Sequence, residues 1–213
     1  MNEMQKKYYE KRAEILVKNL KNRHFDAYYC ETKEDALRQA LALIPEGSVV
    51  GWGGSVTCQQ MGLIDAIRGG NYQPLDRETC RTAEERDELM RKALLSDTFL
   101  TSANAISMDG QMVNIDGNGN RVAAIVYGPK SVIVIAGMNK VVDTVEDAVV
   151  RARTVAAPIN KQRFPAPTPC LTTGSCADCN SDGCICNQVL ITRRNNGEPG
   201  RIKIILVGEE LGF

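Results

Sequence analysis

Short runs of apolar, mostly β-branched residues alternate with longer amphipathic stretches, and this alternation limits the fold more than any other feature of the chain. The apolar runs predict strands at residues 25–30, 48–52, 72–75, 98–107, 111–115, 131–136, 188–192 and 201–207. The amphipathic stretches predict helices at residues 2–22, 32–44, 55–68, 82–95 and 144–156. Strands that alternate with helices of this length form a mainly parallel sheet with helices on both faces. We therefore expect an α/β fold that binds ligands beyond the carboxyl ends of its strands.

A chain of 213 residues can bury most of its apolar surface in one domain, and no fixed-period repeat divides it. We expect a single α/β domain over residues 1–213. The composition changes only within residues 158–187, where four prolines predict an extended connector. We expect residues 165–187 to form a cysteine-rich loop on the domain. Beyond it, the last two strands should flank a turn at Asn195, Asn196 and Gly197.

The charge of the chain is balanced, with 26 basic and 26 acidic residues and a formal net charge of zero. Such a chain has no overall field that attracts nucleic acid or an anionic membrane surface. Its most apolar runs, such as residues 132–138, are far shorter than the roughly 20 residues that cross a bilayer. The charged N-terminal segment lacks the apolar core of a secretory signal. We expect no nucleic-acid partner, no membrane partner and a cytoplasmic location.

A glycine-rich segment, GWGGSVT at residues 51–57, follows one predicted strand. Glycines allow a tight turn, and Ser55 can cap the next helix, whose free N–H groups attract a phosphate or carboxylate. The same segment is also explained by a turn that needs glycine only for a positive φ, with Ser55 as an ordinary N-cap. Both interpretations remain open, and the candidate ligand residues are Gly53, Gly54, Ser55 and Thr57.

Two further segments place polar groups near the ends of predicted strands. Residues 114–121 contain two tight turns with Asn120 and Arg121, and by itself this pattern is typical of a hairpin. Lys140 follows the apolar strand at 131–136, so a parallel sheet would bring it to the same edge as the glycine turn. Lys140 could then bind an anion, although a solvated lysine in a loop is the more common outcome.

Several familiar catalytic arrangements are missing. The only histidine, His24, falls at the predicted end of the first helix, where a cation favours the helix dipole and needs no catalytic explanation. A Ser-His-Asp or Cys-His site would have to use it, so hydrolysis by a triad is disfavoured. The glycine turn also lacks the pattern of a P-loop and of a dinucleotide fingerprint. Cys30, Cys58 and Cys80 stand singly in predicted elements and are expected to pack as core or half-buried thiols.

Five of the eight cysteines lie within residues 170–186, in a loop with few apolar neighbours. Thiols crowded in such a loop are expected to be ligands. Structural disulfides conflict with a reducing cytosol, whereas zinc and an iron–sulfur cluster each take four cysteines. Common zinc ribbons use two Cys-x-x-Cys pairs and this sequence has one, which favours the cluster. The candidates are Cys170, Cys176 and Cys179, with Cys184 or Cys186 as the fourth.

Four segments together resemble the LUD domain, a family that includes lactate-utilisation proteins: GWGGSVT (51–57), SANAISMDGQMVNIDGNGNRVAAIVYGPKSVIVIAGMNKVV (102–142), RARTVAAPINKQRF (151–164) and PCLTTGSCADCNSDGCICN (169–187). The resemblance covers nearly the whole chain and is weakest before residue 45. It implies a fold like that of glucosamine-6-phosphate deaminase, ribose-5-phosphate isomerase and the CoA transferases. In that group, ligands lie at glycine turns that correspond to residues 53–57 here.

The resemblance also implies a ligand set. The family pattern C-x5-C-x2-C-x6-C is matched by Cys170, Cys176, Cys179 and Cys186. Cys184 occupies a position that is usually basic in relatives, so it is a candidate substitute for Cys186. Because Cys184 and Cys186 would point to the same side of an extended segment, the two could exchange.

Three hypotheses about function follow. In the first, the chain is a component of lactate or related organic-acid oxidation, with a [4Fe–4S] cluster, iron–sulfur partner subunits and a pocket for a small anionic or phosphorylated ligand. That pocket would use Gly53, Gly54, Ser55, Asn120, Arg121 and Lys140. In the second, it is a sugar-phosphate or acyl-CoA enzyme with structural zinc, and Asp109 or Asp116 performs acid–base chemistry, although both aspartates are typical turn residues. In the third, it is a metal-stabilised partner module. The substrate, catalysis on this chain and a homo-oligomeric state remain open.

Overall fold

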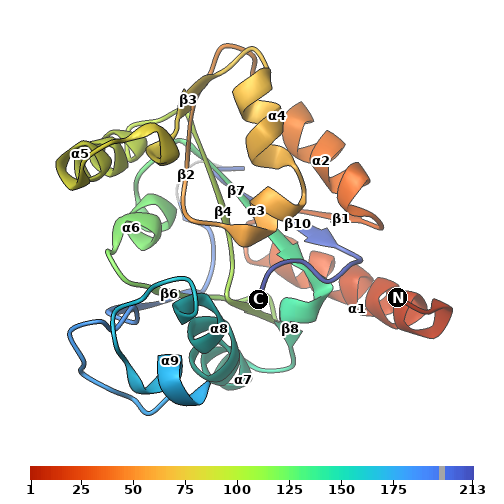
Figure 1. Ribbon diagram of the computed structural model, residues 1–213. Helices are drawn as coiled ribbons and strands as arrows, with labels where there is room; N and C mark the ends of the chain where they lie inside the picture. The colour runs from red at the N-terminus through yellow and green to blue at the C-terminus, as the bar shows by residue number, and fades with distance from the viewer. Residues whose placement is uncertain (197–199) are drawn as a thin grey trace.

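The computed structural model describes residues 1–196 and 200–213, and it contains a six-stranded parallel sheet at its centre (Figure 1). The strand order is β1-β10-β7-β4-β2-β3, and each neighbouring pair is parallel. The strands are β1 (Asp26–Cys30), β2 (Val49–Trp52), β3 (Gln73–Leu75), β4 (Thr98–Ser102), β7 (Ser131–Gly137) and β10 (Ile202–Val207). The predicted α/β fold with a mainly parallel sheet is therefore confirmed.

Both faces of this sheet are buried at its centre, which explains why β7 and β10 are nearly continuous apolar runs. On β7, Val132 and Val134 join the core on one face, while Ile133 and Ile135 join the core on the other. The first face is covered by α1 (Glu3–Asn22), α5 (Ala83–Ala93) and α6 (Asn120–Val126). The second is covered by α2 (Lys33–Ala42), α3 (Val56–Gln60) and α4 (Leu63–Gly69).

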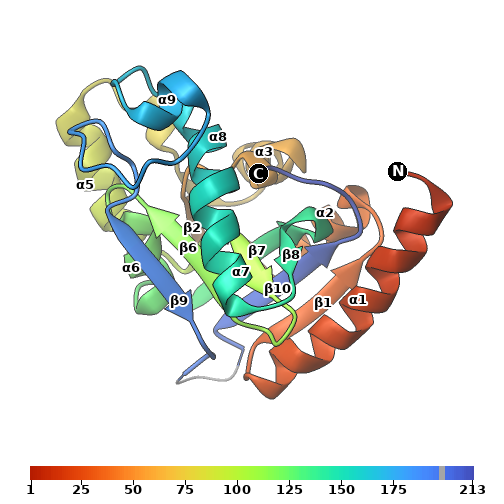
Figure 2. The same cartoon turned by 90° about the horizontal axis from the view of Figure 1, so that it is seen from below.

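A smaller, mixed sheet packs against the first face, as the view from below shows (Figure 2). Its order is β8-β5-β6-β9, and β6 pairs antiparallel with both neighbours. The strands are β5 (Ala105–Ser107), β6 (Met112–Asp116), β8 (Val141–Val142) and β9 (Gln188–Thr192). Ile106 and Met112 face the central core, while Ala105 and Val113 pack against α7 (Val145–Arg151). The molecule is thus built in layers around two sheets.

The expectation of one strand over residues 98–107 was wrong, because the chain changes sheets in the middle of this run. β4 ends at Ser102, and the N–H of Asn104 then donates to the carbonyl of Val113 on β6, 3.0 Å away. The side-chain oxygen of Asn104 also accepts from the N–H of Ile115 at 2.8 Å. Ser102 and Asn104 consequently lie where the two sheets meet.

Two predicted helices differ in the structure, one by a break and one by an extension. The helix expected over residues 55–68 divides into α3 and α4 at Gly62, whose φ of +77° is costly for other residues. The helix expected to stop near residue 156 instead continues through a π-helical turn at Ala152–Ala156 into α8 (Ala157–Lys161). Pro158 was expected in an extended connector but lies in the first turn of α8. A wider π turn before a proline relieves its clash with the preceding helical carbonyls.

Two other expectations also require correction. Residues 114–121 do not form a hairpin, because the Asp116 carboxylate accepts the N–H groups of Arg121 and Val122 and begins α6. The extended connector contains a short helix, α9 (Pro169–Thr173), whose N-cap is Thr168. The last two strands are both present as expected, but they belong to different sheets, since β9 pairs with β6 whereas β10 lies between β1 and β7. Gly197 of the turn expected between them lies outside the described residues.

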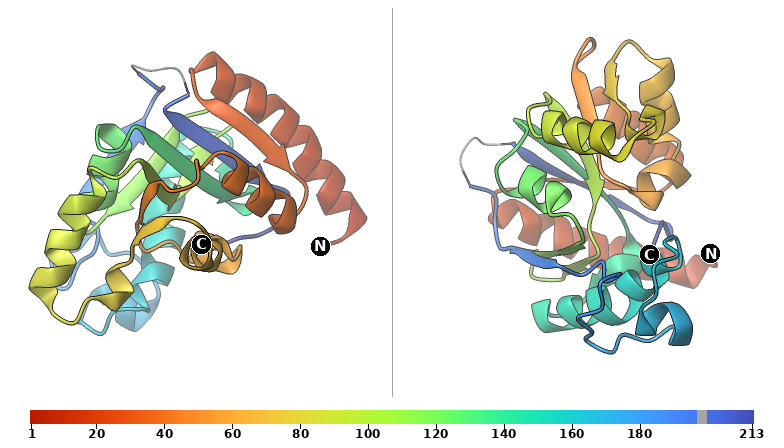
Figure 3. Two further views of the ribbon diagram at one scale, coloured as in Figure 1. Left: turned by 90° about the horizontal axis from the view of Figure 1, so that it is seen from above. Right: turned by 60° about the vertical axis from the view of Figure 1, so that its left-hand side comes forward.

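Helices α7, α8 and α9 lie together at the end of the molecule opposite α4 (Figures 1 and 3). In the described parts of the chain, no helix combines the length and the apolar character needed to cross a membrane. His24 has a φ of +65° just after α1, and the next N–H, of Phe25, donates to the carbonyl of Leu20 at 3.1 Å. This is the geometry of a helix C-terminal cap, so the expected structural place of His24 is confirmed.

Candidate functional site

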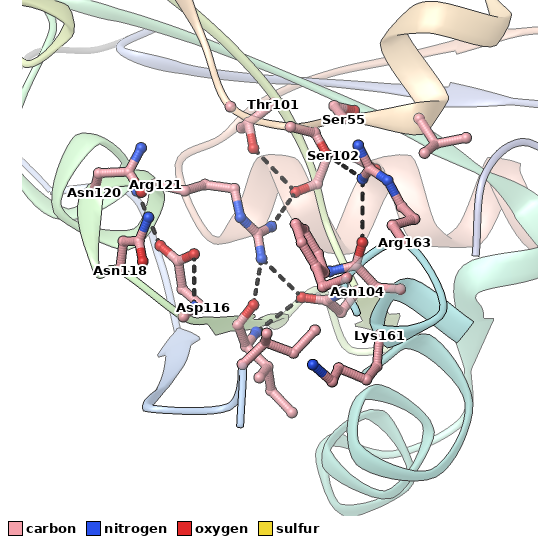
Figure 4. A pocket seen from close by; sticks show the side chains of 18 of the residues that line it. Ser55, Thr101, Ser102, Asn104, Asp116, Asn118, Asn120, Arg121, Lys161 and Arg163 are labelled. Atoms are coloured by element: carbon pink, nitrogen blue, oxygen red, sulfur yellow. Dashed lines mark hydrogen bonds between the residues drawn. The ribbon is translucent and has the colours of Figure 1, made fainter. Parts of the chain in front are cut away.

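A pocket of about 410 Å³ lies beyond the carboxyl ends of the central strands (Figure 4). The segments after β2, β3, β4 and β7 contribute to it because parallel strands end at the same edge of a sheet. The structure brings together all seven ligand residues expected from the sequence: Gly53, Gly54, Ser55, Thr57, Asn120, Arg121 and Lys140. The second sheet and helix α8 close the other side.

Lys140 is buried at the base of this pocket, with an exposed fraction of 2 %. Its ammonium group donates to the hydroxyl oxygens of Thr57 at 2.8 Å and of Ser102 at 3.0 Å. Burial lowers the pKa of Lys140 to about 7, with a further decrease from the charge of Arg151. Lys140 is therefore not the solvated lysine of a typical loop. Near neutral pH it is able to donate or accept a proton.

Arg121 is held by backbone and amide oxygens rather than left free for a ligand (Figure 4). Its two terminal nitrogens donate to the carbonyl of Ser102 at 3.1 Å, to the side-chain oxygen of Asn104 at 3.1 Å and to the carbonyl of Ile115. Burial lowers the pKa of Arg121, and the nearby Asp116 opposes this effect. The guanidinium group thus joins the ends of β4 and β6 and fixes this wall of the pocket.

The glycine turn is needed for close approach and not for a positive φ. Neither Gly53 nor Gly54 is among the residues with positive φ. A Cβ atom at Gly53 would lie 3.2 Å from Cδ of Arg121, which is fixed by its hydrogen bonds, and one at Gly54 would displace the flexible guanidinium end of Arg77. Ser55 caps α3, because its hydroxyl oxygen accepts the N–H of Cys58 at 3.2 Å. The turn therefore makes room for two arginine side chains beside the pocket.

Four cationic side chains of the pocket were not predicted from the sequence: Arg77, Arg86, Lys161 and Arg163. Lys161, at the end of α8, is 1 % exposed, and its ammonium group has no hydrogen-bond partner among the described residues. Burial and then the charges of Arg86 and Arg163 lower the pKa of Arg77. A basic residue just after a predicted strand, such as Arg77, is a signal that the sequence does offer. Lys161 offers no comparable signal because a contact distant in sequence buries it.

The two aspartates suggested for acid–base chemistry have structural partners. Asp109 lies in the turn between β5 and β6, where its carboxylate accepts from Arg23 at 2.6 Å and from Gln111 at 2.9 Å. It does not line the pocket described above. Asp116 does line the pocket, but its carboxylate accepts N–H groups at the start of α6. Both therefore act as turn or capping residues in this structure.

The three isolated cysteines behave as expected. Cys30 and Cys58 are buried and Cys80 is half-buried. Burial raises the pKa of Cys58 to about 11, so its place near the start of α3 does not activate it. All eight cysteines are free thiols, and the five in the C-terminal loop are half-buried or exposed.

The thiols of the cysteine-rich loop lie within electrostatic reach of one another. Burial, and then the neighbouring Cys184, Cys176 and Cys170, raise the pKa of Cys186 to about 12. A hydrogen bond from Ser181 lowers the pKa of Cys179, with a smaller contribution from Cys184. Across residues 1–196 and 200–213, no three Cys, His, Asp or Glu side chains are positioned to hold a metal ion. The donor chemistry fits a four-thiolate centre, whereas the sulfur positions fit only after rearrangement.

The loop is anchored to the body on one side and forms part of the pocket wall. Cys186 packs against the core between the second sheet and α7, and the N–H of Asn187 donates to the carbonyl of Asp116 at 3.0 Å. Ala166, Gly183 and Ile185 line the pocket. The residues on either side of Cys184 therefore face the same cavity as Lys140.

Comparisons with known proteins give a family and a fold. The family model of the LUD domain matches residues 13–207. A solved structure of a DUF162 family protein from Deinococcus radiodurans has a TM-score of 0.51 and 15 % identity, over 95 % of this chain and 98 % of that one. Ribose 5-phosphate isomerase A from Methanocaldococcus jannaschii is a partial likeness, with a TM-score of 0.33 and 18 % identity over 52 % of this chain and 53 % of that one. Among curated proteins, none matches the chain.

Proposed function

The chain belongs to the LUD domain family, and from that premise we propose that it is a cytoplasmic component of lactate-type organic-acid oxidation. In this proposal Cys170, Cys176, Cys179 and Cys186 hold a [4Fe–4S] cluster, with Cys184 as the substitute for Cys186. The observation that carries the proposal is the shared wall: Gly183 and Ile185 of the cysteine-rich loop line the pocket that also contains Lys140. A redox centre at this loop would be adjacent to a bound anion.

The residues of the pocket bind and orient the ligand. Buried cations attract its carboxylate, and the arrangement of Arg121 between Ser102 and Asn104 keeps the pocket open before the ligand enters. Lys140 holds or releases a proton at its amine, since burial brings its pKa to about 7. When bound, a [4Fe–4S] cluster supplies one-electron transfer. The expected partners are iron–sulfur redox subunits, and a homo-oligomer is compatible with this role.

Anaerobic purification with iron, zinc and sulfide analysis tests the proposal. We expect brown protein with about four irons and four sulfides per chain. The double variant Cys176→Ser/Cys179→Ser should lose this content, whereas Cys80→Ser, which changes a half-buried thiol outside the loop, should retain it. Colourless protein with about one tightly bound zinc per chain would reject the redox role.

The second candidate is a sugar-phosphate or acyl-CoA enzyme with structural zinc in the same loop. The observation that favours it is the excess of cationic side chains in the pocket over its single, capped carboxylate. Metal analysis separates the two candidates, because the second requires zinc and no sulfide. Turnover of a phosphorylated or thioester substrate by the zinc protein would establish it.

A further inference from the structure

The pocket concentrates positive charge in a chain that has none overall. Six cationic side chains line it: Arg77, Arg86, Arg121, Lys140, Lys161 and Arg163. Among the residues that the structure describes, Asp116 is the only acidic one that lines the pocket, and its carboxylate accepts N–H groups at the start of α6. Because the net charge of the whole chain is zero, this excess is local to the pocket. One carboxylate from a ligand would neutralise only a small part of it.

Lys161 contributes a positive charge in the inner part of the pocket. Its side chain is directed toward the pocket from the end of α8 (Figure 4). It is 1 % exposed, and no hydrogen-bond acceptor among the described residues contacts its ammonium group. This differs from Lys140, which donates to two hydroxyl groups. A buried cation without a partner is unfavourable, so an anion that enters the pocket would satisfy it.

The cations in the outer part of the pocket are Arg77, Arg86 and Arg163, which come from three different segments of the chain. Arg77 begins a 3-10 turn after β3, Arg86 lies on α5 and Arg163 follows α8. In the structurally described chain, none of the three has a carboxylate within ion-pair distance. Arg163 donates to the carbonyl of Gly54 at 3.3 Å and to Asn160 at 3.2 Å. Arg86 and Arg163 are exposed and Arg77 is half-buried, so this cluster lies nearer to solvent than Lys161.

The two groups of cations suit different anions. Guanidinium groups form paired, fork-like hydrogen bonds, and several of them together are typical of sites that bind a phosphoryl group. The lysine ammonium is a compact point charge that one carboxylate can satisfy. The pocket volume of about 410 Å³ is also much larger than a small hydroxy acid such as lactate requires.

We propose that the ligand of this pocket is a phosphorylated carboxylic acid, whose carboxylate binds Lys161 and whose phosphoryl group binds Arg77, Arg86 and Arg163. This inference rests on the anion pocket of the proposed function and names its ligand class. It does not depend on the metal in the cysteine-rich loop. It predicts that an unphosphorylated hydroxy acid occupies only the inner part of the pocket.

Isothermal titration of the full chain, purified anaerobically, tests this proposal with three probes: inorganic phosphate, L-lactate and 3-phosphoglycerate. At constant ionic strength we expect 3-phosphoglycerate to bind at least about tenfold more tightly than either of the others. Equal affinities for lactate and 3-phosphoglycerate would overturn the proposal. So would an absence of measurable 3-phosphoglycerate binding.

Substitutions in each subsite test the binding of the carboxylate and of the phosphoryl group separately. Lys161→Met should weaken lactate and 3-phosphoglycerate by about tenfold or more and leave phosphate unchanged. Arg77→Gln should weaken phosphate and 3-phosphoglycerate to a similar extent and leave lactate unchanged, and Arg86→Gln repeats this test at an exposed position. Arg91→Gln is the matched control, because Arg91 lies on the same helix as Arg86 and does not line the pocket. If Lys161→Met or Arg77→Gln weakened the binding of all three probes equally, the pocket would not contain separate subsites.

Iron and sulfide analysis of the same samples distinguishes this inference from the proposed function. A protein with an intact cluster and no preference for 3-phosphoglycerate would overturn the two-anion ligand alone. A protein with the preference and without iron would overturn the redox role alone.

Discussion

The part of the pocket around Lys140 and Arg121 and the cysteine-rich loop are organised in opposite ways. In the pocket, Lys140 and Arg121 have hydrogen-bond partners before any ligand is present. In the loop, Cys176 is exposed and no three ligand side chains of the described residues converge. The pocket is therefore formed by folding, whereas a metal centre in the loop would have to draw its own ligands together.

The difference follows from how each region is attached to the core. Thr57, Ser102 and Lys140 lie at or just beyond the ends of buried strands, where the backbone is fixed by the central sheet. Within the loop, Cys186 packs against a hydrophobic core, while Cys170, Cys179 and Cys184 are half-buried outside it. Substitutions in the pocket should therefore change stability and binding together. Substitutions in the loop should change metal content with little effect on the fold.

The largest effect on stability is expected for Arg121→Met. The substitution removes hydrogen bonds to Ser102, Asn104 and Ile115 and leaves their acceptors buried. We expect the free energy of unfolding to fall by about 3 kcal/mol, measured by urea denaturation. Arg91→Met, at an exposed position on α5, is the control and should change it by less than about 0.5 kcal/mol. If Arg121→Met lowered the free energy of unfolding no more than Arg91→Met, the guanidinium group of Arg121 would not join the two sheets.

The next largest effect concerns the pH dependence of stability, through Lys140. Its pKa is about 7 in the folded protein, whereas an unfolded lysine keeps its proton to about 10.4. The unfolded state therefore binds more protons between these values, and the free energy of unfolding should rise by up to about 1.4 kcal/mol per pH unit above pH 7. Urea denaturation from pH 6 to 7.5 measures the onset of this slope.

That range ends at pH 7.5 because an unfolded cysteine loses its proton near its pKa of about 8.5, and the contribution of the buried thiols begins there. The pKa of Cys58 is raised to about 11, so at higher pH its contribution has the opposite sign. Lys140→Met should abolish the increase in the free energy of unfolding with pH. Lys92→Met, which changes an exposed lysine on α5, should retain this increase. An unchanged slope in Lys140→Met would mean that Lys140 keeps its proton in the folded state.

The central sheet can be predicted from the sequence, whereas the segments that bound the pocket can be predicted only in part. Strands buried on both faces are recognisable as apolar runs, and their parallel pairing places Lys140 beside the glycine turn without further information. The change of sheet at Asn104 was not predictable, because residues 98–107 contain no glycine or proline that would mark a break, and periodicity does not identify a hydrogen-bond partner. The start of α6 depends on a local cap at Asp116 that competes with an equally plausible hairpin turn.

Lys161 shows the main limit of prediction from sequence. The proline at 158 indicates the end of a helix, and the expected connector would have left Lys161 in solvent. The π-helical turn at Ala152–Ala156 instead lets the helix continue and buries the lysine in the pocket. A charged side chain acquires this environment only through contacts that are distant in sequence.

In the absence of ligand, Lys161→Met is expected to raise the free energy of unfolding, by less than Arg121→Met lowers it. The substitution replaces a buried ammonium without a partner by an apolar chain of similar length. We expect the free energy of unfolding to increase by about 1–2 kcal/mol, while ligand binding is lost. Thermal and urea denaturation of ligand-free protein measure the change, with Lys92→Met as the control. A decrease in stability would contradict the absence of a partner in the folded protein.

The smallest effect is expected for Arg153→Gln, which breaks the ion pair between α7–α8 and Asp178 of the cysteine-rich loop. The side chains are 40 % and 85 % exposed, so water and salt screen the pair and its loss should cost less than about 0.5 kcal/mol. Iron content should not change, because the metal and not this contact would hold the loop together. Asp178→Asn is the matched variant, since asparagine tolerates the φ of +50° found there. A loss of iron in both variants would show that the protein body positions the cysteines before the metal binds, and the contrast between pocket and loop would then disappear.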